Sequence, residues 1–221
     1  MVEDNAQAIC GRGLGFRIAE LSDAATTSFI IQKNLGTFGD GGAVVTNNPE
    51  IDRIVRKLRN HGSEKRSCHS MGYNSRLDDL HAAVLSAKLK HLAEWSEQRR
   101  QWAARYTKGL ARAKHITLPF ETPGYYHVFH LYVIETKQPK DRDVLLQFLN
   151  EAGIDAKCHY PIAIHLQVGY PWGHEARIAG PIPNSERNAA CCLSLPMFPE
   201  LTAEEVDYTI EKVLEWDRRA Q

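Results

Sequence analysis

Lys33 stands where the sequence could build a reactive amine. A strand-like apolar run at residues 23–31 leads into it, and a glycine-rich turn then leads to a second such run at 42–46. A lysine held between two strands is partly removed from water, and desolvation disfavours its ammonium form. The pKa of Lys33 should therefore fall, which makes a nucleophilic amine accessible for Schiff-base chemistry. This stretch alone fits equally well with a surface lysine whose ammonium reaches solvent.

Two polar residues near the start of the sequence could share a site. Asp4 and Gln7 are three positions apart, so they could face one place as a strand ends and a turn begins. In isolation, such a pair is more often a helix N-cap beside a solvated amide. Both interpretations remain open at this point.

The composition is that of an ordinary globular protein. The 221 residues are 43% hydrophobic and 24% charged, and their formal net charge is zero. The length allows one large domain or two small ones. Balanced charge argues against nucleic acid or an anionic membrane surface as the main partner. No apolar run approaches the roughly 18 residues of a membrane span, and the acidic start at residues 1–4 differs from the basic start of a signal peptide.

The cysteines indicate a cytoplasmic protein. There are five of them, an odd number, and none are in CxxC spacing. This usage is typical of reduced thiols, and it predicts neither a disulfide framework nor a metal site.

Apolar periodicity predicts three helices in the first half of the chain. Pro49 suits the first turn of the first helix. Its apolar stripe consists of Ile51, Ile54, Val55 and Leu58. The second helix is expected over 77–92 and the third over 95–110.

A linker divides the chain after these helices. Pro119, Pro123 and Gly124 mark it, which places a domain boundary between residues 118 and 119. Thr202 and Glu205 form a capping box that begins the last helix. The other expected elements are strands at 128–134 and 154–159, helices at 142–150 and 185–192, a long loop at 166–183, and a short strand or turn at 193–196. Residues 119–221 therefore read as a small α+β domain.

Blocks of sequence in a fixed order add a family resemblance. The blocks are Glu3-Asp4-Asn5-Ala6-Gln7, Ser28-Phe29-x-x-x-Lys33-Asn34-Leu35-Gly36, Gly39-Asp40-Gly41-Gly42-Ala43, Asn60-His61-Gly62, Gly72-Tyr73-Asn74-Ser75-Arg76-Leu77-Asp78, Ala82-Ala83-Val84-Leu85, His159-Tyr160-Pro161-x-x-x-His165 and Leu193-Ser194-Leu195-Pro196. Together they resemble the DegT/DnrJ/StrS family of pyridoxal-phosphate-dependent aminotransferases. The resemblance implies an α/β fold, namely the C-terminal part of a fold type I transferase. Residues 1–118 would form a partial large domain with a mixed sheet and long interdomain helices.

The resemblance assigns a cofactor role to five residues. Lys33 would bind pyridoxal 5'-phosphate as a Schiff base and move the α-proton of the amino donor. Asp4 would pair with the pyridinium nitrogen, which keeps the ring an electron sink. Gln7 would hydrogen-bond the phenolic oxygen and Ser28 the phosphate. Asn74 would reach the phosphate of a neighbouring subunit, because sites in this family lie at the interface of a homodimer.

Four further residues lie where the family approaches its substrate. They are Arg76, His159, Tyr160 and His165. Arg76 could equally be a structural salt-bridge partner. The other three could equally form a polar loop packed at a domain interface.

The implied reaction moves an amino group from an amino acid, with glutamate the expected donor, to a nucleotide-linked keto-sugar. Such a step belongs to amino-sugar, cell-surface polysaccharide or antibiotic-sugar biosynthesis. The alternative is a catalytically impaired remnant that acts only as a binding or subunit-interaction protein. A regulatory protein is disfavoured, because the sequence is neutral and shows no DNA-binding feature.

The sequence departs from the family in two places. Ile30-Ile31-Gln32 replaces the usual aromatic and proline before Lys33. The sequence also begins at the strand that carries Asp4, so about the first two-fifths of a full-length member is expected to be missing. Sheet edges left open in this way predict poor solubility or tight dimerisation.

Overall fold

The computed structural model describes residues 1–65, 68–169 and 177–220. The chain divides into two compact units. Unit 1 contains residues 1–100 and 121–130, and unit 2 contains residues 101–120 and 131–221. The chain crosses between the units at three places, after residues 100, 120 and 130, whereas the sequence predicts a single boundary between residues 118 and 119. That boundary stays a prediction for how the chain folds.

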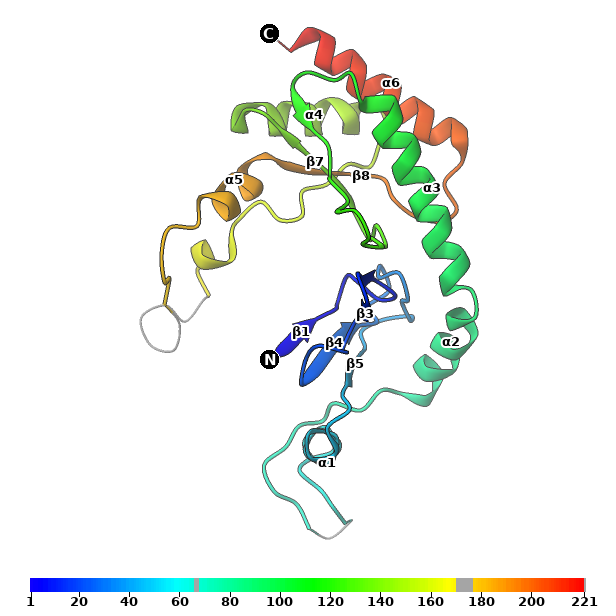
Figure 1. Ribbon diagram of the computed structural model, residues 1–221, viewed down its shortest axis with the longest axis vertical. Helices are drawn as coiled ribbons and strands as arrows, with labels where there is room; N and C mark the ends of the chain where they lie inside the picture. Colours follow the sequence, from blue (N-terminus) through cyan, green and yellow to red (C-terminus); the bar gives the residue numbers. More distant parts are fainter. Residues whose placement is uncertain (66–67, 170–176, 221) are drawn as a thin grey trace. The chain divides into compact units, whose positions relative to one another are not determined.

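Unit 1 is built on a mixed sheet of three strands. They are β1 (Val2–Asp4), β4 (Ala24–Ser28) and β5 (Gly42–Val45). β4 lies in the middle, parallel to β1 and antiparallel to β5 (Figure 1). The short strands β2 (Arg12–Gly13) and β3 (Phe16–Arg17) form a separate antiparallel pair. The two strands expected on either side of Lys33 are therefore confirmed.

The first two helices of unit 1 differ in how well they match the sequence prediction. The first, α1 (Pro49–Leu58), matches its prediction, and Asn48 caps it by accepting from the amides of Glu50 and Ile51. The next, α2 (Asp79–Leu89), is shorter than the 77–92 expected. The reason is a shared apolar cluster, in which Leu77 packs from the preceding loop against Leu85 and Leu92. These residues fit one helical period without belonging to one helix.

The third helix, α3 (Leu92–Leu110), contributes residues to both units. In the described part of the chain, no helix is both long and apolar enough to cross a membrane.

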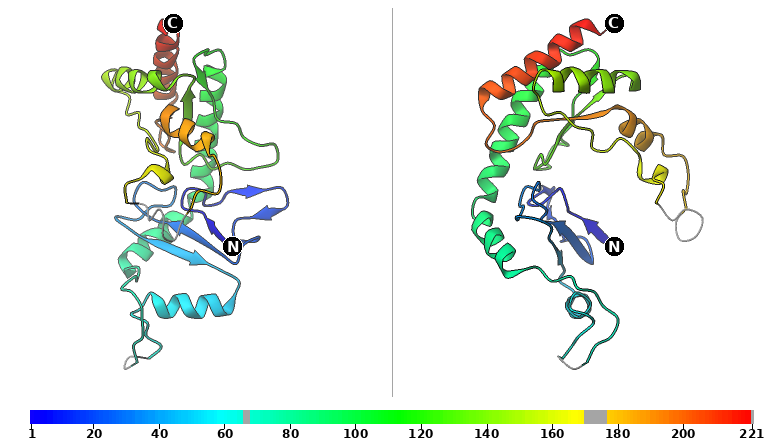
Figure 2. Two further views of the ribbon diagram at one scale, coloured as in Figure 1. Left: turned by 90° about the vertical axis from the view of Figure 1, so that its left-hand side faces the viewer. Right: turned by 180° about the vertical axis from the view of Figure 1, so that it is seen from behind.

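Unit 2 contains both helices and strands, and the predicted small domain at 119–221 stays a prediction. Its elements are β6 (Ile116–Thr117), β7 (Tyr132–Thr136), α4 (Pro139–Glu151), the 3-10 helix η1 (Ile164–Leu166), α5 (Pro183–Cys191), β8 (Cys192–Leu195) and α6 (Ala203–Arg219). The strands form one antiparallel sheet, and α4 packs against β7, β8 and α6 (Figure 2). The predicted capping box of Thr202 and Glu205 is present at the start of α6.

Two predicted strands were wrong in part. Residues 128–131 are not a strand, because the carbonyls of Val128, Phe129 and His130 accept hydrogen bonds from side chains of Asn34 and Arg99. Carbonyls that bind side chains in this way are not paired with a neighbouring strand. Residues 154–159 form only an isolated bridge, between Lys157 and Ser194. Of the predicted loop at 166–183, residues 170–176 lie outside the described residues.

Candidate active site

Lys33 lies in a loop between β4 and β5 that backbone hydrogen bonds hold closed. The amide of Phe29 donates to the carbonyl of Gly41 at 2.8 Å, and the amide of Thr37 donates to the carbonyl of Phe29 at 2.8 Å. Within this closed loop, the amide of Lys33 donates to the carbonyl of Ile30 at 2.9 Å. These three hydrogen bonds within the loop therefore fix the backbone at Lys33.

Gly36 lets this loop fold tightly. A Cβ atom at Gly36 would lie 2.4 Å from the carbonyl oxygen of Ile31 and 2.8 Å from that of Ile30. Only glycine fits so close to the turn that precedes Lys33. The carbonyl of Gly36 also accepts from Nζ of Lys88 at 2.6 Å, which ties the loop to α2.

The electrostatics of Lys33 agree with the expectation from sequence. Burial lowers the pKa of Lys33, while the nearby carboxylate of Asp4 acts in the opposite direction. Asp4 ends β1, where it pairs in register with Thr26 of β4. Its Oδ1 accepts from the amide of Ala6 at 3.0 Å, which orients the carboxylate. The amine of Lys33 and the carboxylate of Asp4 thus interact electrostatically near the end of the parallel strands β1 and β4.

Two more predicted cofactor residues lie at this edge of the sheet. Ser28 is the last residue of β4, and its Oγ accepts from the amide of Ile30 at 3.3 Å. Gln7 is half-buried in the turn that follows β1. Because β1 and β4 are parallel, their carboxyl ends meet at one edge, the usual ligand edge of an α/β sheet. The structure therefore gathers Asp4, Gln7, Ser28 and Lys33, and their contacts to a cofactor stay predictions.

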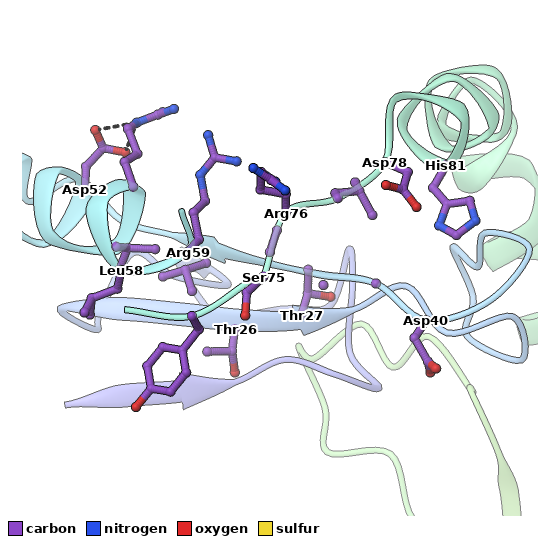
Figure 3. A pocket seen from close by; sticks show the side chains of 18 residues that line it. Thr26, Thr27, Asp40, Asp52, Leu58, Arg59, Ser75, Arg76, Asp78 and His81 are labelled. Carbon is purple, nitrogen blue, oxygen red and sulfur yellow. Dashed lines mark hydrogen bonds and ion pairs between the residues drawn. The ribbon is translucent and has the colours of Figure 1, made fainter. Parts of the chain in front are cut away.

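A cavity of about 790 Å³ lies elsewhere in unit 1, between α1, the strands β4 and β5, and the segment before α2 (Figure 3). Its charged lining residues are Asp40, Asp52, Arg56, Arg59, Arg76 and Asp78. Arg56 is paired with Asp52, since its Nε lies 2.9 Å from Oδ1. Both signs of charge are thus present, and the lining alone does not select a ligand.

The predicted residues Asn74 and Arg76 belong to the segment that forms one wall of this cavity. Both are exposed. Asn74 forms a β-bridge with Asn60, and a guanidinium nitrogen of Arg76 donates to Oδ1 of Asn60 at 3.1 Å. Within the described part of the chain Arg76 is therefore held by an amide, and its role in substrate binding stays a prediction.

Two of the three predicted substrate residues of unit 2, His159 and His165, have polar partners that sequence reasoning missed. Nδ1 of His159 lies 2.9 Å from Oγ of Ser194 on β8. Nε2 of His165 lies 3.1 Å from Oε1 of Glu186 on α5. Tyr160 is exposed. No sequence signal pairs these residues, because each contact joins segments more than twenty positions apart.

Asn34 is a further residue whose contacts sequence reasoning missed. It follows Lys33 directly and is only 8% exposed. Its side chain contacts Val128 and His130. A polar residue inside a glycine-rich loop could have indicated a buried hydrogen bond. Its partners could not be predicted, because they lie 94 and 96 positions away.

The order and geometry of these residues agree with one family. The profile of the DegT/DnrJ/EryC1/StrS aminotransferase family matches residues 1–214, and the chain belongs to this family.

Curated relatives resemble nearly the whole chain. It is 46% identical to a pleiotropic regulatory protein of Geobacillus stearothermophilus, over 99% of this chain and 58% of that protein. It is 43% identical to the dTDP-3-amino-3,4,6-trideoxy-alpha-D-glucose transaminase of Streptomyces venezuelae, over 99% of this chain and 57% of that enzyme. The chain therefore spans a little over half the length of these relatives.

A solved structure supports the fold. The crystal structure of S. venezuelae DesV in complex with a ketimine intermediate matches with a TM-score of 0.91 at 43% identity. The match covers 100% of this chain and 58% of that one. The expected partial fold type I architecture is confirmed by this agreement.

Proposed function

We propose that the protein is an aminotransferase that moves an amino group from an amino acid, with glutamate the donor, to a nucleotide-linked keto-sugar. The observation that carries this proposal is the lysine of lowered pKa beside the carboxylate of Asp4, at the edge where β1 and β4 end. The name of the S. venezuelae relative, a dTDP-amino-sugar transaminase, supports the acceptor class. The product would serve antibiotic-sugar or cell-surface polysaccharide biosynthesis.

Aminotransferases of this family use pyridoxal phosphate. The residues at the sheet edge fit that group, because they offer an amine, an oriented carboxylate and a hydroxyl. Bound pyridoxal phosphate supplies an electron sink for an amino acid that loses its α-proton. Lys33 would hold the cofactor covalently, Ser28 would donate to its phosphate, and Gln7 would donate to its phenolic oxygen.

The side chains divide the proton chemistry between them. Neutral Lys33 can take the α-proton of the amino acid donor at Nζ, because its lowered pKa favours the unprotonated amine. It can later deliver a proton to the amino-sugar product. Asp4 would keep the ring nitrogen protonated through its negative charge. The hydrogen bond from Ala6 holds the carboxylate in one orientation for that task.

Four residues are proposed to bind the sugar nucleotide. The planar guanidinium of Arg76 suits a diphosphate, which it can bind through two hydrogen bonds at once. His159 and His165 are oriented by Ser194 and Glu186, so their ring nitrogens have defined directions. Exposed Tyr160 would contact the sugar or the nucleoside.

A homodimer with shared active sites is proposed, in which Asn74 binds the cofactor phosphate of the neighbouring subunit. Exposed Asn74 is available for such a contact. Sedimentation velocity should give a species of twice the chain mass. Mixing Lys33→Ala with Asn74→Ala chains should restore activity, because a hybrid dimer rebuilds one site from both subunits. A monodisperse monomer, or no restoration in the mixture, would contradict shared sites.

A cytoplasmic location is proposed as well. All five cysteines are free thiols, as expected for proteins in a reducing compartment.

The function is tested by spectroscopy on the 221-residue chain. Adding pyridoxal phosphate should give a visible absorbance band, glutamate should shift it, and a dTDP-linked keto-sugar should restore it. The absence of a visible absorbance band at saturating pyridoxal phosphate would contradict the proposed function. The binding-only alternative expected no turnover, and it is not favoured, because the S. venezuelae relative is named as an enzyme.

A further inference from the structure

Asn34 connects the Lys33 loop to a distant segment of unit 1. Its Nδ2 donates to the carbonyl of Val128 at 3.1 Å, and its Oδ1 lies 3.0 Å from Nδ1 of His130. Asn34 is 8% exposed, its contact with Val128 is buried, and its contact with His130 is half-buried. A shielded hydrogen bond holds its geometry more firmly than an exposed one.

The carbonyl of Val128 fixes the orientation of this amide. A carbonyl oxygen only accepts, so the nitrogen of the Asn34 amide must face it. The amide oxygen then faces His130, which must donate through Nδ1–H. The contact thus selects the Nδ1-protonated form of His130, and it fails if that proton is absent.

Asn34 acts at a different point of the loop from the other attachments. Nζ of Lys88 binds the carbonyl of Gly36, and Oγ1 of Thr37 donates to the carbonyl of His81 at 3.4 Å. Both tie the end of the loop to α2. Asn34 alone among these three side chains anchors the residue next to Lys33.

We infer that Asn34 and His130 are positioning residues that hold the amine of Lys33 at the edge of the sheet where Asp4 ends β1. The pair fixes the backbone one residue after Lys33, while the turn at Ile30 fixes it before. Losing the pair frees the side chain to turn toward solvent. The inference rests on the proposed role of Lys33 and names the residues that place it.

The test measures Lys33 without cofactor or substrate. The chain is labelled with acetic anhydride across a range of pH, and mass spectrometry quantifies each lysine. In Asn34→Ala and His130→Ala, the pKa of Lys33 should rise toward the ordinary lysine value of about 10.4. Each rise of the pKa by one lowers the neutral fraction at pH 8 about tenfold, and labelling falls with it. The exposed Lys140 serves as the internal reference.

Controls separate positioning from folding. Asn184→Ala, an exposed asparagine in α5, should leave the Lys33 profile unchanged. A merely structural role would lower the unfolding temperature but leave the Lys33 profile of the folded chain as it is. Wild-type profiles in both variants would overturn the inference. So would unfolding of both, because the pair would then be a requirement of the fold.

The outcomes are distinguishable from failure of the proposed function. A chain that never binds pyridoxal phosphate still gives a labelling profile for Lys33. Conversely, a chain that transaminates normally while both variants label like wild type would refute positioning and leave the function intact.

Discussion

Replacing Lys33 with alanine is expected to remove the visible absorbance of the cofactor-loaded chain and to lower transamination by about 10²- to 10⁴-fold. The reason is that Lys33 is both the proposed covalent anchor and the group that carries the α-proton. Its loop stays closed in the variant, because the three backbone hydrogen bonds around it involve no lysine side chain. Absorbance spectra and glutamate-dependent turnover measure the two effects.

Lys140→Ala is the matched control for this experiment. Lys140 is exposed on α4 in unit 2, so its loss should change neither absorbance nor turnover. Borohydride treatment of the wild type should fix the cofactor on Lys33 alone, as read by peptide mass. Fixation at another lysine, or full turnover in Lys33→Ala, would show that the anchor has been misassigned.

Sequence reasoning worked best where the structure is set by neighbouring residues. The strands on either side of Lys33, the start of α1 at Pro49 and the capping box of Thr202 and Glu205 all follow from local patterns. The lowered pKa of Lys33 also agrees with its prediction, because burial is the main cause of the shift. In each case the neighbouring residues alone were enough to predict the structure.

Sequence reasoning failed where a distant segment decides the local structure. The apolar run at 128–134 reads as one strand, yet residues 128–131 bind side chains from Asn34 and Arg99. Asn34 itself looks like an ordinary loop residue until those partners are in place. Partners about thirty and ninety-five positions away leave no mark on local periodicity.

The proposed cofactor residues and the proposed substrate residues differ in what places them. Asp4, Gln7, Ser28 and Lys33 share one sheet edge because parallel β1 and β4 end together. His159 and His165 instead depend on contacts to Ser194 and Glu186 within unit 2. The family pattern could predict their positions in sequence, but the groups that orient them required the structure.

Replacing Asp4 with asparagine is expected to change the amine and the reaction in opposite directions. The carboxylate raises the pKa of Lys33 against the effect of burial, so removing its charge should lower that pKa further. Labelling of Lys33 at pH 8 should therefore increase. Transamination should nevertheless fall by about 10²- to 10³-fold, because the ring nitrogen loses the charge that keeps it protonated.

Asparagine is the informative substitution because its Oδ1 can still accept from the amide of Ala6, which preserves the turn after β1. Asp155→Asn, at an exposed carboxylate in unit 2, is the matched control and should alter neither measurement. A more reactive amine in a slower enzyme would separate the two roles of Asp4, since a distorted site would lose both. Reduced labelling together with reduced turnover would mean that Asp4 supports the position of Lys33 and not its charge balance.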